Sequence, residues 1–465
     1  MIDDRMTFDD RCASDARSPR RVLMISCAFP PTGGPGVQRS VKFAKYLPRC
    51  GWLPTVWTAG PLAGLPVDSS LLDGLPLSVN VHAQTAGLAG PAIRRSLRRT
   101  AAGGGALARL TSGLAWRFES WIGGEPCPDE YVAWARRSID PLIRMIRRHR
   151  VDVLYSTFSP ASNHWLGLML KRQTGLPWVA DFRDLWTDDY RYVEPSEQRR
   201  EAHRRLEQTV LDTADAVVGV TPRQTEILRG RVTNAADRFT TITNGFDPDD
   251  FADAASPCHS PTNEFVLAHV GRFDRWRVDD AWFAGLARFA SDLGAHRDRF
   301  VFRLVGHAGE QVRRRVLAAG VRFECVGYVS HGQAIRAMHD ASALLLAVPS
   351  GPNADSVIPA KLFEYLASKR PILVVGPEDG CAERIVRSTH SGMAVGFDEA
   401  AIAESLRRLH DAHRSGRPMA GCSTDRLTPY RRDVLTKSLA GVLARVSGTN
   451  RAVRPKAREP QTVGV

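Results

Sequence analysis

The sequence predicts an α/β protein with two doubly wound domains, each built on a parallel sheet. Short apolar runs alternate with amphipathic stretches, a pattern typical of parallel strands that helices cover on both faces. The runs form two series, and the turn-rich residues 244–263 separate them. The predicted strands are 22–27, 55–58, 153–157, 178–182 and 216–220 in the first series and 265–271, 300–306, 324–329, 343–348 and 371–376 in the second.

These two series define the expected organisation of the chain. Ligands of open parallel sheets bind beyond the carboxyl ends of the strands, so two such domains facing each other would form a cleft lined by loops from both. Both ends of the chain are polar and are expected to be disordered. The predicted parts are a disordered end (1–20), an N-terminal domain (21–245), a linker (246–264), a C-terminal domain (265–426), a helix packing back toward the N-terminal domain (427–447) and a second disordered end (448–465).

The composition favours an anionic ligand. The 465 residues include 63 Lys and Arg against 50 Asp and Glu, and the resulting net charge of +13 attracts nucleic acid, anionic lipid or phosphorylated small molecules. No pattern resembles a nucleic-acid-binding module, so we expect no nucleic acid partner. The eight cysteines form no CxxC pair or zinc spacing, and no apolar run approaches the ~20 residues of a membrane-spanning helix. Because the polar N-terminus is unlike a signal peptide, we expect a cytoplasmic protein.

A glycine-rich loop follows the first predicted strand. The stretch FPPTGGPGVQR (29–39) contains Gly33, Gly34 and Gly36 and leads into the amphipathic run VKFAKYL. A strand that ends in glycines before a helix exposes backbone N–H groups, which suit a phosphate. The loop is neither GxGxxG nor a P-loop, and a tight turn without a ligand is the alternative.

A second candidate site lies in DSVIPAKLFEYLASKRPILVVG (355–376). Pro359 predicts the first turn of a helix, which places Ser356 and Val357 at the approach to its N-terminus. Lys361 and Glu364 are three residues apart and would share a helix face. A phosphate at the helix start would have Lys361 as its counter-charge, and Glu364 would accept hydrogen bonds from a ribose diol. The alternative is a surface Lys–Glu pair.

Residues 91–124 depart from this alternation. They carry six arginines interleaved with leucines, two tryptophans and a phenylalanine. Two interpretations are open: a helical excursion packed on its own domain, or a patch that docks on an anionic membrane surface.

Five motifs in order along the chain resemble glycosyltransferases of the GT-B fold and the family 4 type. They are the glycine loop, VGVTP (218–222), TNGFDPDDF (243–251), HVGRFD (269–274) and IPAKLFEYLASKRPIL (358–373). The bacterial cell-surface and exopolysaccharide branch is the most similar, since runs like WVADFRDLW (178–186) occur there as well. The resemblance covers residues 21–446. It implies two Rossmann-like domains and a hexosyltransferase that moves a sugar from a nucleotide sugar to a hydroxyl, usually with retention and without a metal ion or cofactor.

The resemblance assigns donor-binding residues by position. Glu364 matches the ribose ligand, Arg272 matches the arginine that holds the leaving diphosphate, and Gly33 and Gly34 match the loop near the donor phosphate and the acceptor. Two expected side chains are absent: the first glutamate of the family's pair falls at Ser356, and a lysine falls at Val278. The missing positive charge would come from Arg275, Arg277 or Lys361.

The catalytic histidine of the family is also absent, because its place after the strand WVADF holds Arg183. Asp181, Arg183 and Asp184 are therefore the candidates at the reacting centre. His164 lies upstream, where a histidine opening a helix is more often structural than a ligand of substrate.

Asp247 and Asp249 mimic the DxD metal site of the other large glycosyltransferase fold. They follow the turn signal Asn244-Gly245, and we expect Asp249 or Asp250 to cap a helix instead. No other cluster of acidic residues and histidines suggests a metal.

The reaction implied is a substitution at an anomeric carbon with a nucleoside diphosphate leaving. Arg272, Lys361 and helix N-terminal N–H groups would stabilise charge growing on the β-phosphate. Retention without an evident nucleophile suggests attack on the leaving group's own face, with the departing phosphate taking the acceptor's proton.

Several alternatives stay open at the level of the sequence. On the same fold, the chain would be a nucleotide-sugar 2-epimerase or a non-catalytic nucleotide-sugar-binding or assembly protein. If it transfers a sugar, the acceptor is either lipid-linked, at the inner face of the cell membrane in surface polysaccharide or glycolipid synthesis, or a soluble natural product.

Overall fold

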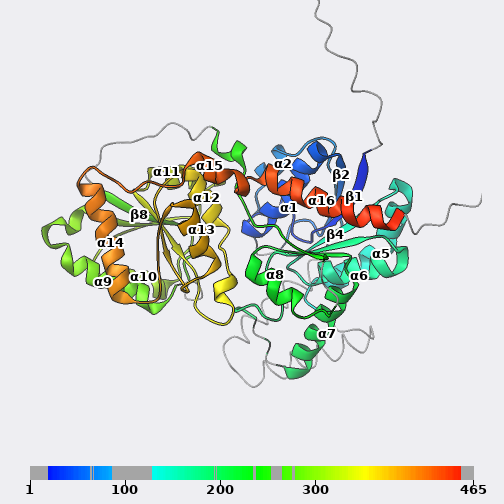
Figure 1. Ribbon diagram of the computed structural model, residues 1–465, viewed down its shortest axis with the longest axis horizontal. Helices are drawn as coiled ribbons and strands as arrows, with labels where there is room; N and C mark the ends of the chain where they lie inside the picture. Colours follow the sequence, from blue (N-terminus) through cyan, green and yellow to red (C-terminus); the bar gives the residue numbers. More distant parts are fainter. Residues whose placement is uncertain are drawn as a thin grey trace, which may run out of the picture.

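The computed structural model describes residues 19–62, 65, 67–85, 128–192, 194, 196–233, 237–252, 264–274 and 278–451. These residues form two α/β domains side by side (Figure 1). The predicted insertion 91–124, most of the predicted linker and nearly all of the two predicted disordered ends lie outside the described residues.

The N-terminal domain contains a seven-stranded sheet in the order β3-β2-β1-β4-β5-β6-β7, with every pairing parallel. Its helices connect successive strands and cover both faces of the sheet. Its elements are β1 (Arg20–Ile25), α1 (Pro35–Tyr46), η2 (Leu47–Cys50), β2 (Trp52–Thr58), α2 (Ser70–Asp73), β3 (Asn80–Ala83), α5 (Val132–His149), β4 (Val153–Phe158), α6 (Ser162–Thr174), β5 (Trp178–Phe182), α7 (Glu197–Thr213), β6 (Ala216–Gly219), α8 (Pro222–Arg229) and β7 (Phe239–Thr241).

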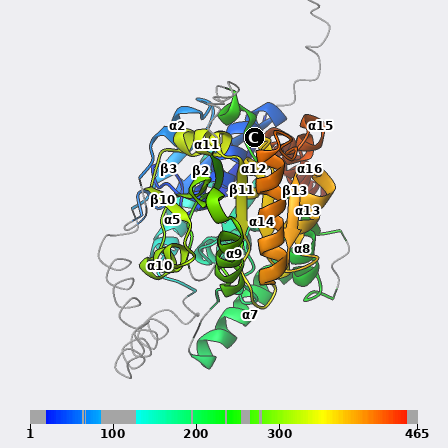
Figure 2. The ribbon, with the colours of Figure 1, turned by 90° about the vertical axis from the view of Figure 1, so that its left-hand side faces the viewer.

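The C-terminal domain contains a six-stranded parallel sheet in the order β10-β9-β8-β11-β12-β13. Figure 2 looks onto this domain, where α9 and α14 pack side by side. Its elements, after η3 (Pro248–Phe251), are β8 (Phe265–Val270), α9 (Asp280–Asp292), η4 (Gly294–Arg299), β9 (Phe300–Val305), α10 (Glu310–Ala318), β10 (Arg322–Gly327), α11 (His331–Asp340), β11 (Ala343–Ala347), η5 (Ala354–Ser356), α12 (Lys361–Ser368), β12 (Ile372–Val375), α13 (Cys381–Thr389), β13 (Gly392–Val395), α14 (Glu399–Arg414), α15 (Thr424–Leu427), η6 (Thr428–Tyr430) and α16 (Arg432–Arg451).

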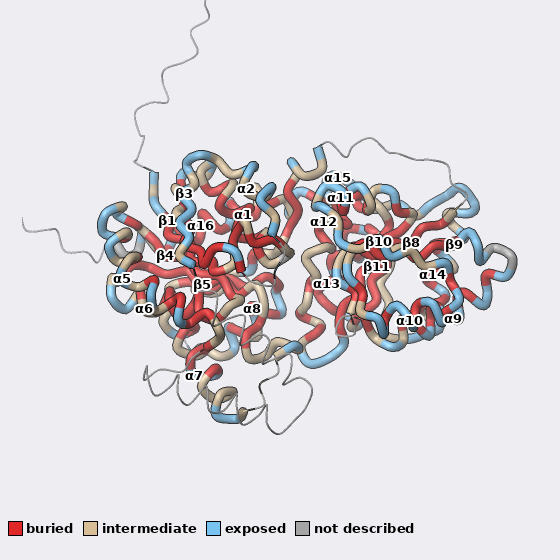
Figure 3. Tube along the Cα trace, turned by 180° about the vertical axis from the view of Figure 1, so that it is seen from behind, coloured by how far each residue is buried: buried red, intermediate tan, exposed pale blue. Residues whose placement is uncertain are grey.

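The predicted fold class is confirmed, and each of the ten predicted runs overlaps a strand. The strands that the apolar pattern missed are β3, β7 and β13, and all three lie at sheet edges. Their residues are exposed or half-buried, whereas central strands such as β4 are buried throughout. An edge strand needs no continuous apolar run, because one of its sides faces solvent. Figure 3 shows this distribution, with buried strands inside and exposed segments outside.

The chain crosses between the domains at two places that lie against each other. The first crossing follows β7, and the second leads from η6 into α16, which packs against α1. The two crossings are joined by backbone hydrogen bonds, from the N–H of Phe246 to the carbonyl of Tyr430 (3.0 Å) and from the N–H of Arg432 to the carbonyl of Phe246 (2.9 Å). Leu439 and Leu443 of α16 belong to the apolar core of the N-terminal domain.

We predict that Gly245→Ala lowers the free energy of unfolding by about 1–3 kcal/mol, the range for overpacking a tight site. A Cβ at this position would overlap the Tyr430 carbonyl oxygen and lie 2.6 Å from Leu435 Cδ1, so the two crossings would have to separate. The measurement is the midpoint of thermal unfolding. Gly441→Ala on α16 is the control, because its Cβ meets nothing within 4 Å and alanine favours a helix. Equal midpoints for the two variants would contradict this account of the crossing.

Candidate functional site

The glycine loop lies between β1 and α1, at the carboxyl end of the strand. Gly34 adopts a φ of 101° as the N-cap of α1, a conformation that favours glycine, and Pro35 begins the helix. Gly33 beside it is buried. The loop therefore presents backbone at the start of a helix of twelve residues, as a phosphate-approach loop requires.

Arg183 lies beside this loop, in the segment that follows β5. Its guanidinium donates hydrogen bonds to the carbonyl oxygens of Gly36 and Ser159, the second at 3.0 Å. A Cβ on Gly36 would come within 3.0 Å of Arg183 Nη1, so the third glycine allows the arginine to approach. Burial lowers the pKa of Arg183 from its ordinary value, while the nearby Asp184 carboxylate opposes this. Arg183 thus supplies a fixed positive charge and, unlike a histidine, no base.

Asp181 is fully buried, and its carboxylate is surrounded by hydrogen-bond donors. Its carboxylate accepts hydrogen bonds from Arg39 Nη2 (2.7 Å), from the Tyr155 hydroxyl (2.8 Å) and from Thr157 Oγ1 (2.9 Å). Burial alone would raise the pKa of the Asp181 carboxyl, but the charge and hydrogen bonds of Arg39 outweigh it and hold that pKa below its ordinary value. The contacts of Asp181 are those of a structural group, and none of them favours the reacting role that the sequence suggested.

Asp184 and His164, the other two candidates near this strand, differ in exposure. The Asp184 side chain is about one-third exposed and pairs with Arg191 at 3.0 Å, so it faces solvent. His164 is fully buried, shares a hydrogen bond with Ser156 Oγ (2.7 Å) and packs against Phe182. Burial lowers the pKa of His164 to about 3, so it is neutral at physiological pH. The structure agrees with a structural role for His164.

On the C-terminal domain, Arg272 follows β8 and has a largely exposed side chain. Its side chain is 67% exposed, and its nearest carboxylate, Asp274, is 3.8 Å away. Arg272 lines a hollow of about 380 Å³ together with His307 and the residues that begin α10. Val278, which stands where the family has a lysine, is buried in the apolar core. Arg275 and Arg277, the candidates for the missing positive charge, lie outside the described residues.

Lys361 and Glu364 form an ion pair on the first turn of α12. The helix begins at Lys361, so Pro359 lies two residues before it rather than inside its first turn; its carbonyl accepts from the N–H of Leu362 at 2.9 Å. Lys361 Cγ lies about 4.0 Å from where a Cβ of Gly271 would stand, which places this lysine beside the turn that carries Arg272. The structure thus brings Arg272, Lys361 and Glu364 to one edge of the C-terminal sheet.

The segment before α12 contacts the N-terminal domain. Ser356 is fully buried, donates to the carbonyl of Asn353 (2.6 Å), and accepts through its own carbonyl from Thr221 Oγ1 (3.0 Å). Val357 follows it, half-buried. Arg223 adds an ion pair to Asp355 at 3.4 Å. Ser356 and Val357 are therefore held at the domain interface, and Ser356 brings no charge where the family has a glutamate.

The sequence did not indicate this interface role of Thr221. In the sequence, VGVTP contributes only to the resemblance. The one local sign of a role for Thr221 is that Thr-Pro is typical of a helix start. Thr221 Oγ1 does cap α8, since it accepts from the N–H of Gln224 (3.0 Å). Asn353 Nδ2 similarly donates to the Asp188 carbonyl (3.1 Å). These contacts join loops that follow strands of both sheets, so the carboxyl edges of the two sheets face each other.

Asp247 belongs to an ionic cluster between the domains. It accepts from Lys42 Nζ (2.6 Å), from Lys45 Nζ (2.8 Å) and from the Tyr46 hydroxyl, all on α1. It also caps η3 through the N–H of Asp249 (3.1 Å), so the cap is Asp247 and not Asp249 or Asp250 as expected. The described residues contain no group of three or more His, Cys, Asp or Glu arranged to hold a metal ion.

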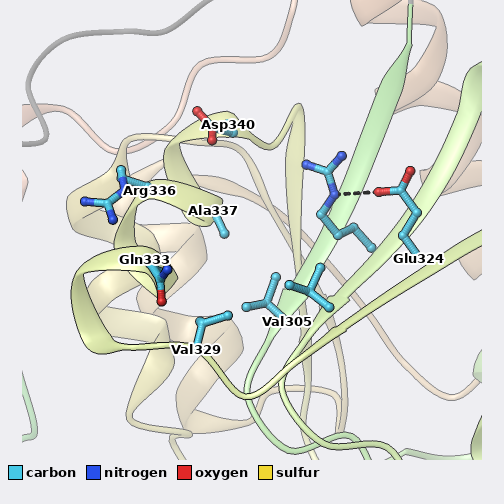
Figure 4. Close-up of a pocket in the computed structure, with 9 residues that line it drawn as sticks. Val305, Glu324, Val329, Gln333, Arg336, Ala337 and Asp340 are labelled. Atoms are coloured by element: carbon cyan, nitrogen blue, oxygen red, sulfur yellow. Dashed lines mark hydrogen bonds and ion pairs between the residues drawn. The ribbon is translucent and has the colours of Figure 1, made fainter.

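A second hollow, of about 500 Å³, lies between β9, β10 and α11 (Figure 4). Its lining includes the ion pair of Arg303 and Glu324 (2.8 Å), with Gln333, Arg336 and Asp340 on the helix. None of the motif residues lines it, so the site is better placed at the edge that carries Arg272.

Comparisons with known proteins agree with this geometry. Residues 33–245 match the model of a family described as glycosyl transferase 4-like domain. No curated protein matches the sequence. Similar solved structures include sucrose-phosphate synthase from Thermosynechococcus elongatus (16% identity, 93% of this chain and 99% of that chain, TM-score 0.56).

Two further structures have the same fold. One is α,α-trehalose 6-phosphate synthase from Burkholderia multivorans (13% identity, 95% of this chain and 100% of that chain, TM-score 0.60). The other is HepE from Anabaena in complex with UDP and glucose (14% identity, 93% and 99% covered, TM-score 0.52). Two parallel sheets with facing carboxyl edges define the GT-B class. The chain therefore has the GT-B fold, and its N-terminal domain matches the glycosyl transferase 4-like family.

The ionic cluster leads to a pH-dependence prediction. Burial would raise the pKa of Asp247, but Lys42, Lys45 and Tyr46 outweigh it and lower that pKa to about 2. A depressed pKa contributes stability that is present above the unfolded value of about 4 and is lost as the pH falls toward 2. Asp247→Asn should therefore be less stable than the wild type at pH 7, with the gap closing between about pH 4 and 2 in denaturant unfolding. A gap that stays constant over this range would contradict the cluster.

Proposed function

We propose that the chain transfers a sugar from a nucleoside diphosphate sugar to a hydroxyl acceptor in the cleft between its domains. The observation that carries this proposal is the position of Arg272, an exposed guanidinium lining a hollow at the carboxyl edge of the C-terminal sheet, with Lys361 beside it. Two cations at such an edge suit a diphosphate. Glu364, on the same face of α12 as Lys361, would accept hydrogen bonds from the ribose.

In this proposal the protein stabilises the leaving group. Negative charge grows on the β-phosphate as the anomeric bond breaks, and in this proposal Arg272 and Lys361 neutralise it. Lys361 pairs with Glu364 in the structure, so it exchanges this partner for the diphosphate when a donor binds. Across the cleft, the glycine loop and Arg183 would face the sugar and the acceptor. Retention of configuration and independence of metal ions belong to the same proposal.

A non-catalytic nucleotide-sugar-binding protein is the second candidate. It is favoured by Ser356 and Val278, which replace a glutamate and a lysine, and by Arg183 in place of the histidine. Such a protein would bind a donor without turning it over with any acceptor.

For the acceptor we propose a lipid-linked or other hydrophobic molecule at an anionic membrane surface, as in surface polysaccharide or glycolipid synthesis. Supporting this, four apolar side chains in β3 or in the 15 residues before it are exposed, namely Leu65, Val67, Leu77 and Val81, and the basic segment 91–124 follows in the sequence. None of the helices in the described ranges is long and apolar enough to cross a bilayer. Docking would bring the cleft of a cytoplasmic enzyme to its acceptor.

We predict that Glu364→Ala and Arg272→Ala each reduce sugar transfer by roughly 30- to 1,000-fold, because each loses a charge-assisted bond worth about 2–4 kcal/mol in the transition state. Transfer is measured as nucleoside diphosphate released, in the presence of EDTA, since the proposed mechanism needs no metal ion. Arg288→Ala on α9 is the matched control and should retain wild-type activity. Near-wild-type turnover in both site variants would refute the donor site, and loss of wild-type activity in EDTA would refute metal independence.

Membrane docking predicts that the wild-type chain sediments with anionic vesicles at low salt and less at high salt. Each basic side chain near an anionic surface contributes roughly 1 kcal/mol, which salt screens. Changing Arg94, Arg95, Arg98 and Arg99 to Ser should lower the sedimented fraction. Wild-type protein that stays in the supernatant at low salt would favour the soluble acceptor instead.

A further inference from the structure

Arg432, the first residue of α16, is buried at the point where the chain crosses between the domains. Its side chain is 3% exposed, and its backbone N–H is fixed to the carbonyl of Phe246 at 2.9 Å. Its guanidinium forms no hydrogen bond or ion pair with the residues that the structure describes, and its Nη1 is buried without a partner among them. A buried guanidinium without a partner is costly, and native proteins seldom retain one without a use for it.

The carboxylates around Arg432 already have cations of their own. Asp181 is paired with Arg39, and Asp247 is paired with two lysines of α1. Burial and then the charge of Arg39 lower the pKa of Arg432 to about 9, whereas Glu364, Asp247 and Asp181 act in the opposite direction. Of these three, Glu364 stands apart, because its partner Lys361 lies in the proposed donor site.

Glu364 and Arg432 come from segments that pack directly together. The ring of Phe363, which precedes Glu364, lies 5.4 Å from the ring of Tyr430, two residues before Arg432. The Glu364 side chain is only 16% exposed, and its charge acts on the Arg432 guanidinium. The carboxylate and the guanidinium therefore lie in the same region, where α12 contacts the residues that lead into α16.

We propose that Arg432 is a positioning residue of the donor site: its guanidinium takes the Glu364 carboxylate when Lys361 turns to the diphosphate of a bound donor. This inference rests on the proposed function, because it needs an anion that draws Lys361 away. The exchange fixes Glu364 for the ribose and gives the buried Arg432 its counter-charge. Since α16 packs on α1, the same exchange of ion pairs also couples the N-terminal domain to donor binding.

The experiment measures stability and diphosphate binding separately in Arg432→Met, Arg432→Lys and the neighbouring control Arg431→Gln. Arg431 is 43% exposed and paired with Asp433, so its variant should behave as the wild type. The probe is whichever of UDP, GDP, dTDP and ADP raises the wild-type melting temperature most, and its Kd is measured by calorimetry. Arg432→Met should keep or raise the melting temperature of the free protein, because an unpaired buried charge is removed. It should also weaken binding of the probe at least tenfold, and Arg432→Lys should restore part of the loss.

Glu364→Gln provides the test of coupling. In that background Arg432→Met should cause little further loss of affinity, since the two residues act through one ion pair. Equal affinity of Arg432→Met and the wild type, or independent losses from the two changes, would overturn the inference while leaving the proposed function standing. A melting temperature that falls with full retention of affinity would show a merely structural arginine and also overturn it. A wild-type chain that binds none of the four diphosphates would overturn the proposed donor site itself.

Discussion

The buried ion pair between Arg39 and Asp181 holds in place the parts of the N-terminal domain that face the cleft. Arg39 belongs to the helix that the glycine loop begins, and Asp181 lies on the strand that leads to Arg183. The same guanidinium donates to the carbonyls of Ile242 and Thr243, both at 2.9 Å, just before the chain crosses to the C-terminal domain. Losing one partner of a buried ion pair costs about 3–5 kcal/mol of stability. The positions of the glycine loop, of Arg183 and of the crossing between the domains therefore depend on this one interaction.

Some charged side chains near the domain boundary have close counter-ions, whereas others have a distant counter-ion or none among the described residues. Asp247 is neutralised by Lys42 and Lys45 of α1, and these ion pairs hold the crossing to the helix that the glycine loop begins. Arg272 is mostly exposed, and Arg432 is buried without a partner among the described residues. Saturated pairs stabilise the scaffold, whereas an incoming anion gains most at a cation whose counter-ion is distant, as for Arg272, or missing among the described residues, as for Arg432. This division supports a donor site on the C-terminal side of the cleft.

The sequence predicts the central strands, the glycine-rich loop before α1 and the helix α12, because each of these depends on a local pattern. The edge strand β3 was not predicted, since its side chains are exposed and form no continuous apolar run. The role of Asp181 could not be read locally either, because its partner Arg39 is 142 residues away in the chain. Asp247 is likewise explained by lysines about 200 residues distant rather than by its DxD neighbours. The positions of Glu364 and Arg272 follow from resemblance rather than from a local pattern, and the structure brings both to one edge of the C-terminal sheet.

If a nucleotide sugar binds in the cleft and is held by the C-terminal domain, it should stabilise the folded chain. The most direct measurement is a thermal-shift screen of the wild-type chain with UDP, GDP, dTDP and ADP sugars. A ligand at 100 times its Kd adds about 2.7 kcal/mol to the stability of the folded state. We predict that one class of nucleotide sugar raises the melting temperature by several degrees, and that Arg272→Ala abolishes the rise. No shift with any of the four classes, or a shift that Arg272→Ala leaves intact, would contradict it.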